Sequence, residues 1–200
     1  MREAHDDARR ARRRELRIQR RRIPPPERIA AADALAARLL ALPFASIQGH
    51  VAGYWAMDGE MALHAWQLRL PPAVAYCLPV LHDDGQLRFA PWRPGAPLAT
   101  NRFGIPEPAV ANDALLRPEA MDLVVVPLVA FDAGCHRLGM GGGWYDRSFA
   151  FRRERDAPPW LVGAAFALQQ ADALHPQSWD VPLDAVCTER ATHLREPETP

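Results

Sequence analysis

The stretch Leu123-Val124-Val125-Val126-Pro127 decides the fold class of this 200-residue chain. An uninterrupted, largely β-branched run without polar alternation is typical of a strand that is covered on both faces. Further strand-like runs alternate with helical patterns, which predicts an α/β fold with a mostly parallel sheet flanked by helices. We expect an open, Rossmann-like three-layer domain over residues 1–195, with residues 1–12 flexible and residues 196–200 a frayed tail.

The other elements are placed outward from this strand by hydrophobic periodicity and by breakers. An arginine-rich helix is predicted over residues 8–22, because Pro24 to Pro26 end it, and an amphipathic helix follows over residues 27–42. The remaining predictions are strands at 47–57, 74–81, 87–92, 160–168 and 186–188, helices at 61–70 and 144–155, and a loop at 93–108.

The composition excludes several classes of protein. The net formal charge is zero and 48% of residues are hydrophobic, so nothing global indicates a nucleic-acid or membrane partner. The chain has neither the apolar run of about 20 residues that spans a bilayer nor the apolar core of a secretory leader, and we expect a cytoplasmic protein. Its three cysteines, Cys77, Cys135 and Cys187, form no C-x-x-C pair, which argues against disulfides and a zinc site.

All 24 basic residues are arginine. A Walker A loop and Schiff-base chemistry both need a lysine, so both are excluded. Phosphate would therefore be held by arginine, backbone N–H groups or a metal. Eleven of the arginines lie within residues 1–28, against five acidic residues, so this segment carries a local charge of +6.

The chemistry is concentrated in the stretch Arg137-Leu138-Gly139-Met140-Gly141-Gly142-Gly143-Trp144-Tyr145-Asp146-Arg147. Glycines let backbone N–H groups converge on an anion, and the start of the following helix adds its dipole. Arg137 can supply a fixed positive charge, and Asp146 is a carboxylate that suits magnesium. By itself this loop predicts anion or nucleotide binding; a flexible turn with a helix cap is the alternative.

This stretch and four further motifs resemble 5-formyltetrahydrofolate cyclo-ligases, also called 5,10-methenyltetrahydrofolate synthetases. The first motif runs from Pro127 through Phe131-Asp132 and Gly134 into the glycine loop. The others follow the family's order: Arg13-Arg14-Glu15-Leu16-Arg17 with Pro26-Glu27, Trp55 to Glu60, Phe103-Gly104-Ile105-Pro106-Glu107-Pro108, and Trp179 to Thr188. The resemblance covers roughly residues 13–190.

The resemblance implies an enzyme that uses ATP and Mg²⁺ to convert 5-formyltetrahydrofolate into 5,10-methenyltetrahydrofolate, with release of ADP and phosphate. In that reaction the formyl oxygen is phosphorylated and the N-10 amine of the substrate attacks, so no protein nucleophile is needed. Catalysis then consists of positioning and charge stabilisation. The implied partner is a small folate, with or without a polyglutamate tail, and we expect a monomer with no nucleic-acid or membrane partner.

The resemblance also assigns roles to residues. It implies catalytic roles for Arg137, Gly141 and Tyr145, and metal ligands at Asp146 and Asp184. The implied nucleotide contacts are Arg13, Arg17, Arg137, Leu138, Gly139, Met140, Gly141, Gly142, Gly143, Trp144 and Tyr145. The implied folate contacts are Arg17, Trp55, Glu60, Met140, Gly141, Gly142, Gly143 and Trp144.

Other interpretations remain open at the level of sequence. The basic N-terminal helix is also compatible with a nucleotide- or RNA-binding protein, and the fold with a sugar-phosphate isomerase or an acyl-CoA transferase relative. One of Trp144 and Tyr145 is expected to pack into the core, and Glu107 and Asp184 resemble ordinary loop acids. The chain departs from the family at Ala62 and Leu63, where an acidic and hydroxylic pair is usual, at Gly142, where lysine is frequent, and at Trp144, which replaces tyrosine or phenylalanine.

Overall fold

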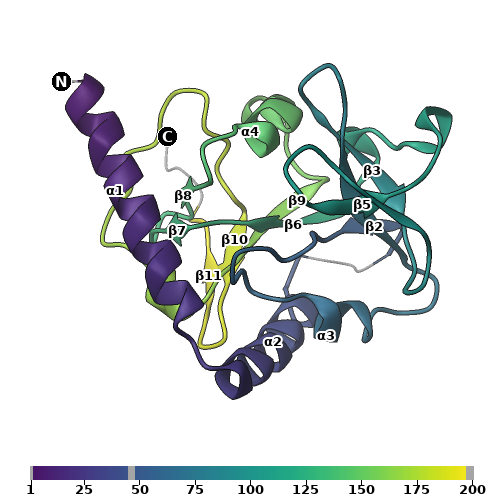
Figure 1. Cartoon of the computed structure of the whole chain (residues 1–200), viewed down its shortest axis with the longest axis horizontal. Coiled ribbons are helices and arrows are strands. Elements are labelled where there is room, and N and C mark those ends of the chain that lie inside the picture. Colours follow the sequence, from purple (N-terminus) through teal and green to yellow (C-terminus); the bar gives the residue numbers. More distant parts are fainter. Residues whose placement is uncertain (1, 45–47, 197–200) are drawn as a thin grey trace.

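A computed structural model describes residues 2–44 and 48–196, and one seven-stranded sheet runs through it (Figure 1). The strand order is β11-β10-β9-β6-β1-β2-β3. The inner pairings are parallel, and both edge strands, β11 and β3, are antiparallel to their neighbours. The predicted mostly parallel sheet is therefore confirmed, with strands at β1 His50–Ala52, β2 Ala75–Leu81, β3 Leu87–Pro91, β6 Leu123–Pro127, β9 Trp160–Ala164, β10 Ala185–Cys187 and β11 Thr192–Leu194.

Strand β6 lies at the centre of this sheet and has the predicted bounds. It pairs with β1 on one side and with β9 on the other, where Val124 is opposite Leu161. Val124 and Val125 are fully buried, which is what a β-branched run between two covered faces requires.

Helices cover both faces of the sheet. On one face α2 (Pro25–Leu40) and α3 (His64–Gln67) bury Leu35, Leu39 and Trp66 in a shared core. On the other face α4 (Trp144–Ser148) and the 3-10 turn η3 (Ala150–Arg153) flank the buried Phe149. The long helix α1 (Arg2–Arg21) stands at the side, next to the small β7–β8 ribbon (Figure 1).

Three predicted elements are shorter than expected. The strand predicted at 47–57 is only β1, since the chain leaves the sheet at Gly53 and turns at Asp58 and Gly59, both with positive φ; Ile47 lies outside the described residues. The helix predicted at 61–70 contracts to α3. The helix predicted at 144–155 is interrupted at Phe149, whose ψ of 19° is not helical.

Several short elements were not predicted. The expected loop 93–108 contains a hairpin of β4 (Leu98–Thr100) and β5 (Pro106–Pro108), and β7 (Ala130–Phe131) pairs with β8 (Arg137–Leu138). Strands of two or three residues show no periodicity that could reveal them. Further 3-10 turns are η1 (Asn112–Ala114), η2 (Pro118–Ala120) and η4 (Ala167–Gln169), the last lying where the strand predicted at 160–168 was expected to continue.

At the termini, helix α1 includes residues predicted to be flexible, because it starts at Arg2 rather than at residue 8. The predicted tail 196–200 lies outside the described residues except for Glu196. Within the part of the chain that the structure describes, none of the helices has the length and apolar character needed to cross a bilayer.

Candidate functional site

The candidate site lies where the carboxyl ends of β1 and β6 meet helix α1. Arg20 of α1 is 1% exposed and connects the two strand ends. Its guanidinium donates to Asp58 O at 3.0 Å, in the loop after β1, and to Leu128 O at 3.2 Å, directly after β6. Parallel α/β sheets bind ligands at this edge, and here the N-terminal helix closes it.

The glycine loop follows β8 at this edge. Gly141 has φ +99° and Gly143 has φ +65°, values that side chains with a Cβ rarely adopt, so glycine is required at both. Helix α4 after the loop has only five residues. The expected dipole contribution is therefore small, and the predicted binding of an anion would depend mainly on the backbone amides of the loop.

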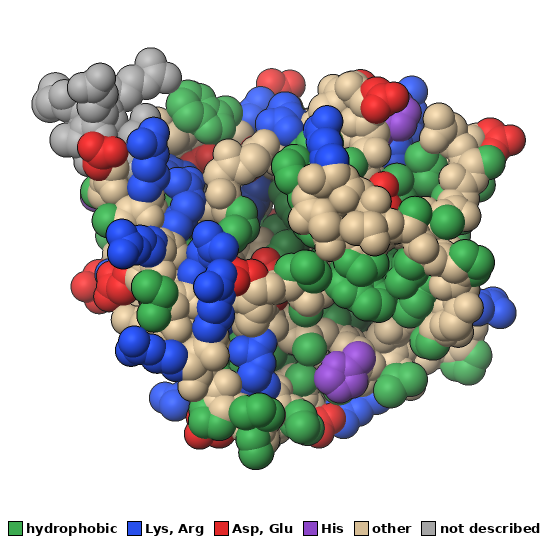
Figure 2. Space-filling view, viewed as in Figure 1, with side chains coloured by type: hydrophobic (Ala, Val, Ile, Leu, Met, Phe, Trp, Pro, Cys, Tyr) green, Lys and Arg blue, Asp and Glu red, His purple; other side chains and the backbone are tan. Residues whose placement is uncertain are grey.

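Arginines surround the glycine loop. Arg13 of α1 donates to Gly139 O at 2.8 Å, and its guanidinium would be in van der Waals contact with a Cβ at Gly141. Arg147 of α4 donates to Gly142 O at 2.8 Å and to Gly85 O at 2.9 Å, which fixes the loop to the β2–β3 turn. Figure 2 shows the arginines of α1 as a blue column along this side of the molecule.

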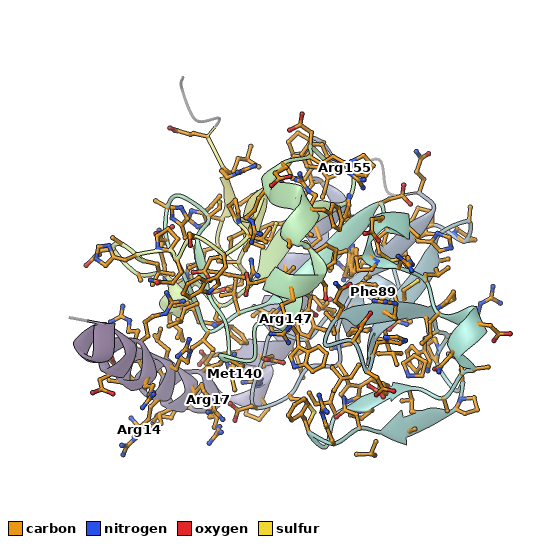
Figure 3. All side chains as sticks on the ribbon, turned by 90° about the horizontal axis from the view of Figure 1, so that it is seen from above. Arg14, Arg17, Phe89, Met140, Arg147 and Arg155 are labelled. Atoms are coloured by element: carbon orange, nitrogen blue, oxygen red, sulfur yellow. The ribbon has the colours of Figure 1, made fainter. Side chains whose placement is uncertain are left out.

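Arg17 is directed to a different partner. Its Nε donates to Asp58 Oδ2 at 2.6 Å, in the turn after β1. Figure 3 places the labelled Met140 of the loop between Arg17 of α1 and Arg147 of α4. Of the two predicted phosphate arginines, Arg13 therefore contacts the loop directly, whereas Arg17 is held by a carboxylate.

Arg137 and Asp146 form an ion pair inside the site. The Arg137 side chain is 5% exposed, and its guanidinium contacts Asp146 Oδ1 and Val181 O. The Val181 N–H donates to the same Asp146 oxygen at 3.1 Å. Within the described residues Oδ2 of Asp146 has no hydrogen-bond partner, so one carboxylate oxygen remains able to coordinate a cation.

Asp184 lies in a different environment from Asp146. Its side chain is 6% exposed and accepts from Arg152 at 2.9 and 3.0 Å, from the Leu161 N–H at 2.8 Å and from Arg195 at 3.4 Å. Both oxygens are saturated, which does not fit the predicted role as a metal ligand. Asp184 instead ties β9, η3 and the C-terminal segment together.

The folate-side prediction Glu60 lies among buried tyrosines. Its Oε2 accepts the Met57 N–H at 2.9 Å, and burial raises the pKa of the carboxyl, against the opposing effect of that hydrogen bond and of Arg20. Tyr54 and Tyr145 both lie close enough to sense its charge, and burial raises the pKa of each phenol. The structure therefore brings Glu60 and Tyr145, which are far apart in the sequence, into one polar cluster.

The aromatic residues predicted for the site, Trp55, Trp144 and Tyr145, each contact different partners. Tyr145 points inward and stacks on Phe149 at 6.3 Å. Trp144 lies on the rim, where Arg102 and Arg147 stand 5.5 and 5.1 Å from its ring. Trp55 packs edge-on against Trp92 at 5.9 Å. Both Trp144 and Tyr145 are half-buried and pack against the core cluster that contains Phe149, so core packing, expected for one of the two, is found for both.

Sequence reasoning missed several residues of this site. Arg20 and Tyr54 were not predicted, because a buried arginine in a basic helix and a tyrosine in a strand-like run give no signal of their own. The Asp58-Gly59 pair does indicate a turn, and this turn receives Arg17, Arg20 and Arg21.

Glu107 accepts from the Leu81 N–H at 3.2 Å and from Asn101, so it holds the β4–β5 hairpin to β2.

A second hollow of about 700 Å³ lies between α2 and the turn after β10. Its walls include five alanines together with Phe166 and Leu168, and its charged groups are Glu27, Glu189 and Arg190. None of the predicted site residues lines it. The glycine loop with its arginines therefore remains the candidate site.

Comparisons with known proteins identify the family of the chain. The model of the 5-formyltetrahydrofolate cyclo-ligase family matches residues 5–189. The chain is 38% identical to the 5-formyltetrahydrofolate cyclo-ligase of Haemophilus influenzae over 67% of this chain and 72% of that protein. It is 34% identical to that of Escherichia coli K12 over 86% and 96%, respectively.

A solved structure extends the likeness to the fold. The NMR structure of 5,10-methenyltetrahydrofolate synthetase from Aquifex aeolicus aligns with a TM-score of 0.79 and 26% identity, covering 96% of this chain and 95% of that one. On the sequence match along most of its length and the shared fold, the chain belongs to the 5-formyltetrahydrofolate cyclo-ligase family and is an enzyme of that class.

Proposed function

We propose that this enzyme catalyses the ATP- and magnesium-dependent cyclisation of 5-formyltetrahydrofolate to 5,10-methenyltetrahydrofolate, with phosphorylation of the formyl oxygen and release of ADP and phosphate. The observation that carries the proposal is the convergence of two binding surfaces at one sheet edge. The glycine loop with Arg13 and Arg137 offers amides and guanidinium groups to phosphate. The cluster of Glu60 and Tyr145 beside it offers polar groups and an aromatic face to a pterin.

The chain's residues act by binding and orientation in this proposal. The loop amides and Arg13 hold the triphosphate, and Arg137 balances the charge that develops on the transferred phosphoryl group. Glu60 accepts hydrogen bonds from the amino and ring N–H groups of the pterin. The attacking N-10 belongs to the substrate and loses its proton to solvent as the C–N bond forms, so the absence of a protein nucleophile among these residues is expected.

Magnesium fits at Asp146. The carboxylate offers Oδ2, and Mg²⁺ in proteins is often held by one or two carboxylates together with waters and substrate phosphates. Bound there, the ion would supply positive charge against the phosphate oxygens. No cluster of three or more acidic, histidine or cysteine ligands occurs among the described residues, which favours a site completed by phosphate.

The RNA-binding alternative is less favoured. It requires α1 to present its arginines outward, whereas most of them contact the body of the protein. Arg9 contacts Asp180 and His175 O, Arg13 contacts the glycine loop, and Arg17, Arg20 and Arg21 converge on Asp58. Helix α1 is better explained as one wall of the active site.

The proposal is tested by mixing purified enzyme with ATP, magnesium and 5-formyltetrahydrofolate and following the near-ultraviolet absorbance of the methenyl product. We expect product formation that requires both ATP and magnesium, together with one ADP per methenyl product. A rate equal to that of a control without ATP would reject the proposed reaction.

A further inference from the structure

Tyr76 lies in a strand that contributes none of the site residues assigned above. It lies in β2 opposite Val51 of β1 and is 9% exposed. Its ring packs edge-on against Trp66 at 5.9 Å, and its hydroxyl reaches Gly53, the first residue after β1. A Cβ at Gly53 would lie 2.8 Å from Tyr76 Cζ and would overlap the hydroxyl. Glycine at position 53 therefore lets this hydroxyl reach the carboxyl end of β1.

The Tyr76 hydroxyl has no hydrogen-bond partner among residues 2–44 and 48–196. The buried, unpartnered side-chain atoms in that part of the chain are Arg38 Nε and Trp66 Nε1. Tyr76 Oη is not one of these buried, unpartnered atoms, so part of its surface is accessible to solvent. A largely buried hydroxyl is normally hydrogen-bonded within the protein, so an accessible one without a partner is suited to bind a ligand.

Tyr54 shows what a structural tyrosine in the same cluster does. Its hydroxyl donates to Met61 O at 2.7 Å, and this bond ties the loop after β1 to the start of α3. Both rings belong to the same hydrophobic cluster, and both are at least nine-tenths buried. The two residues therefore differ mainly in whether the hydroxyl is already bonded to the protein.

Tyr76 also shares its electrostatic surroundings with the proposed folate groups. Tyr54 and Tyr145 each sense the charge of Glu60 and each interact with Tyr76. Tyr145 in addition senses Arg137 of the nucleotide side. Tyr76 thus lies within electrostatic reach of Tyr54 and Tyr145, the two tyrosines that sense Glu60, and its hydroxyl lies against Gly53 at the carboxyl end of β1.

We propose that Tyr76 is a further substrate-binding residue, whose hydroxyl forms a hydrogen bond with a polar atom on the pterin ring of the folate. The inference rests on the proposed function, because it takes the folate to bind against Glu60 and Tyr145. A hydroxyl both donates and accepts, so it complements the carboxylate of Glu60, which only accepts. Together they can recognise both the N–H groups and the carbonyl or ring-nitrogen acceptors of a pterin.

The test compares Tyr76→Phe with the matched variant Tyr54→Phe, which removes the same atom from the same cluster. For Tyr76→Phe we expect KM for 5-formyltetrahydrofolate to rise roughly three- to tenfold, the range of one neutral hydrogen bond. KM for ATP should stay within about twofold, and the melting temperature within about 1 °C, since no protein bond is lost. For Tyr54→Phe we expect a lower melting temperature, because Met61 O loses its donor.

Glu60→Gln, measured in parallel, separates this inference from the proposed function. If Glu60→Gln raises the folate KM and Tyr76→Phe does not, the role of Tyr76 is rejected while the folate site stands. If neither variant changes the folate KM, the folate is bound elsewhere: the roles of Glu60 and Tyr76 are both rejected, while the proposed reaction, which is tested by product formation, stands. A melting temperature that falls as far in Tyr76→Phe as in Tyr54→Phe, or an equal rise in KM for both substrates, would also overturn the role of Tyr76.

Discussion

Glu60 is a carboxylate whose burial raises its pKa while its proposed role requires the charged form. An ionised carboxylate accepts hydrogen bonds from pterin N–H groups, and a protonated one loses part of this capacity. Folate binding should therefore weaken on acidification at a higher pH than an ordinary glutamate would dictate.

We expect Glu60→Gln to raise the folate KM at pH 7 by roughly 10- to 100-fold, the range of hydrogen bonds to a charged group. The same variant should flatten the rise of the folate KM that the wild type shows as the pH falls toward 5. A raised pKa in the folded state favours folding below the unfolded pKa, and this contribution is lost as pH rises through the folded pKa. At pH 7 the variant should thus be as stable as the wild type or more stable. A KM profile in steady-state kinetics that keeps the wild-type pH dependence would contradict this role.

Asp146 and Asp184 were both predicted as metal ligands, and the structure separates them. Asp146 keeps one oxygen without a partner, whereas Asp184 is saturated by four contacts. We expect Asp146→Asn to raise the magnesium concentration needed for half-maximal activity by about tenfold, and also to lower the melting temperature, because the buried Arg137 loses its charged partner.

Asp184→Asn is the matched variant for Asp146→Asn. It should leave the magnesium requirement unchanged and destabilise the fold by about 3 kcal/mol, because Arg152 would remain buried beside a neutral side chain. Magnesium titrations of activity and thermal melts of both variants measure the two effects. An increased magnesium requirement in Asp184→Asn would restore it as a ligand.

Helix α1 forms the proposed nucleotide side of the site through Arg13 and is held in place at Asp58. Three of its arginines meet Asp58, in the turn that leads to Glu60. Burial alone would raise the pKa of Asp58, but hydrogen bonds from Arg17 and Arg21 outweigh it and lower the pKa. Arg28 of α2 adds a bond to Glu60 O at 3.1 Å. The same turn thus holds both α1, on the proposed nucleotide side, and Glu60, on the proposed folate side.

We expect Asp58→Asn to destabilise the protein by about 2 kcal/mol and to raise KM for ATP several-fold, because Arg20 is buried and Arg17 loses its charged partner. A lowered pKa favours folding above the unfolded pKa of about 4, and this contribution is lost as pH falls through the folded pKa. The difference in unfolding free energy should therefore disappear at strongly acidic pH.

The exposed pair of Asp33 with Arg69 at 2.6 Å is the control, and Asp33→Asn should cost less than about 0.5 kcal/mol. Equal effects of the two substitutions in urea titrations would refute the anchoring role.

Long or deeply buried helices and strands could be predicted from the sequence, whereas short and exposed ones could not. Strand β6 was placed correctly because its two-sided burial demands an apolar run, and α2 because its apolar residues recur at helical spacing. The edge strand β11 and the hairpin β4–β5 were missed, since three exposed or half-buried residues carry no pattern. The site shows the same division. The glycine loop is visible in one continuous stretch, whereas Tyr76 reaches the site only through the parallel pairing of β1 and β2.

At the scale of the whole molecule, the two proposed ligands contact parts of one continuous sheet. The loops after β1 and β6 and helix α1 are joined through Arg20, and both faces of the sheet have large apolar clusters. A ligand at this edge should therefore stabilise the entire fold and not one segment. This also tests the expectation of a single domain over residues 1–195.

We expect a single cooperative thermal transition whose midpoint rises when magnesium and a non-hydrolysable ATP analogue are added. At an analogue concentration of about 100 times its dissociation constant, mass action contributes about 2.7 kcal/mol, which corresponds to a rise of about 5 to 10 °C for a chain of this size. Arg13→Gln should lose most of this rise because Arg13 borders the glycine loop, whereas Arg10→Gln should keep it, since the exposed Arg10 contacts Asp7 on the same helix. Scanning calorimetry of the three proteins decides the matter. Two separate transitions would reject the single domain, and an undiminished rise in Arg13→Gln would remove α1 from the nucleotide site.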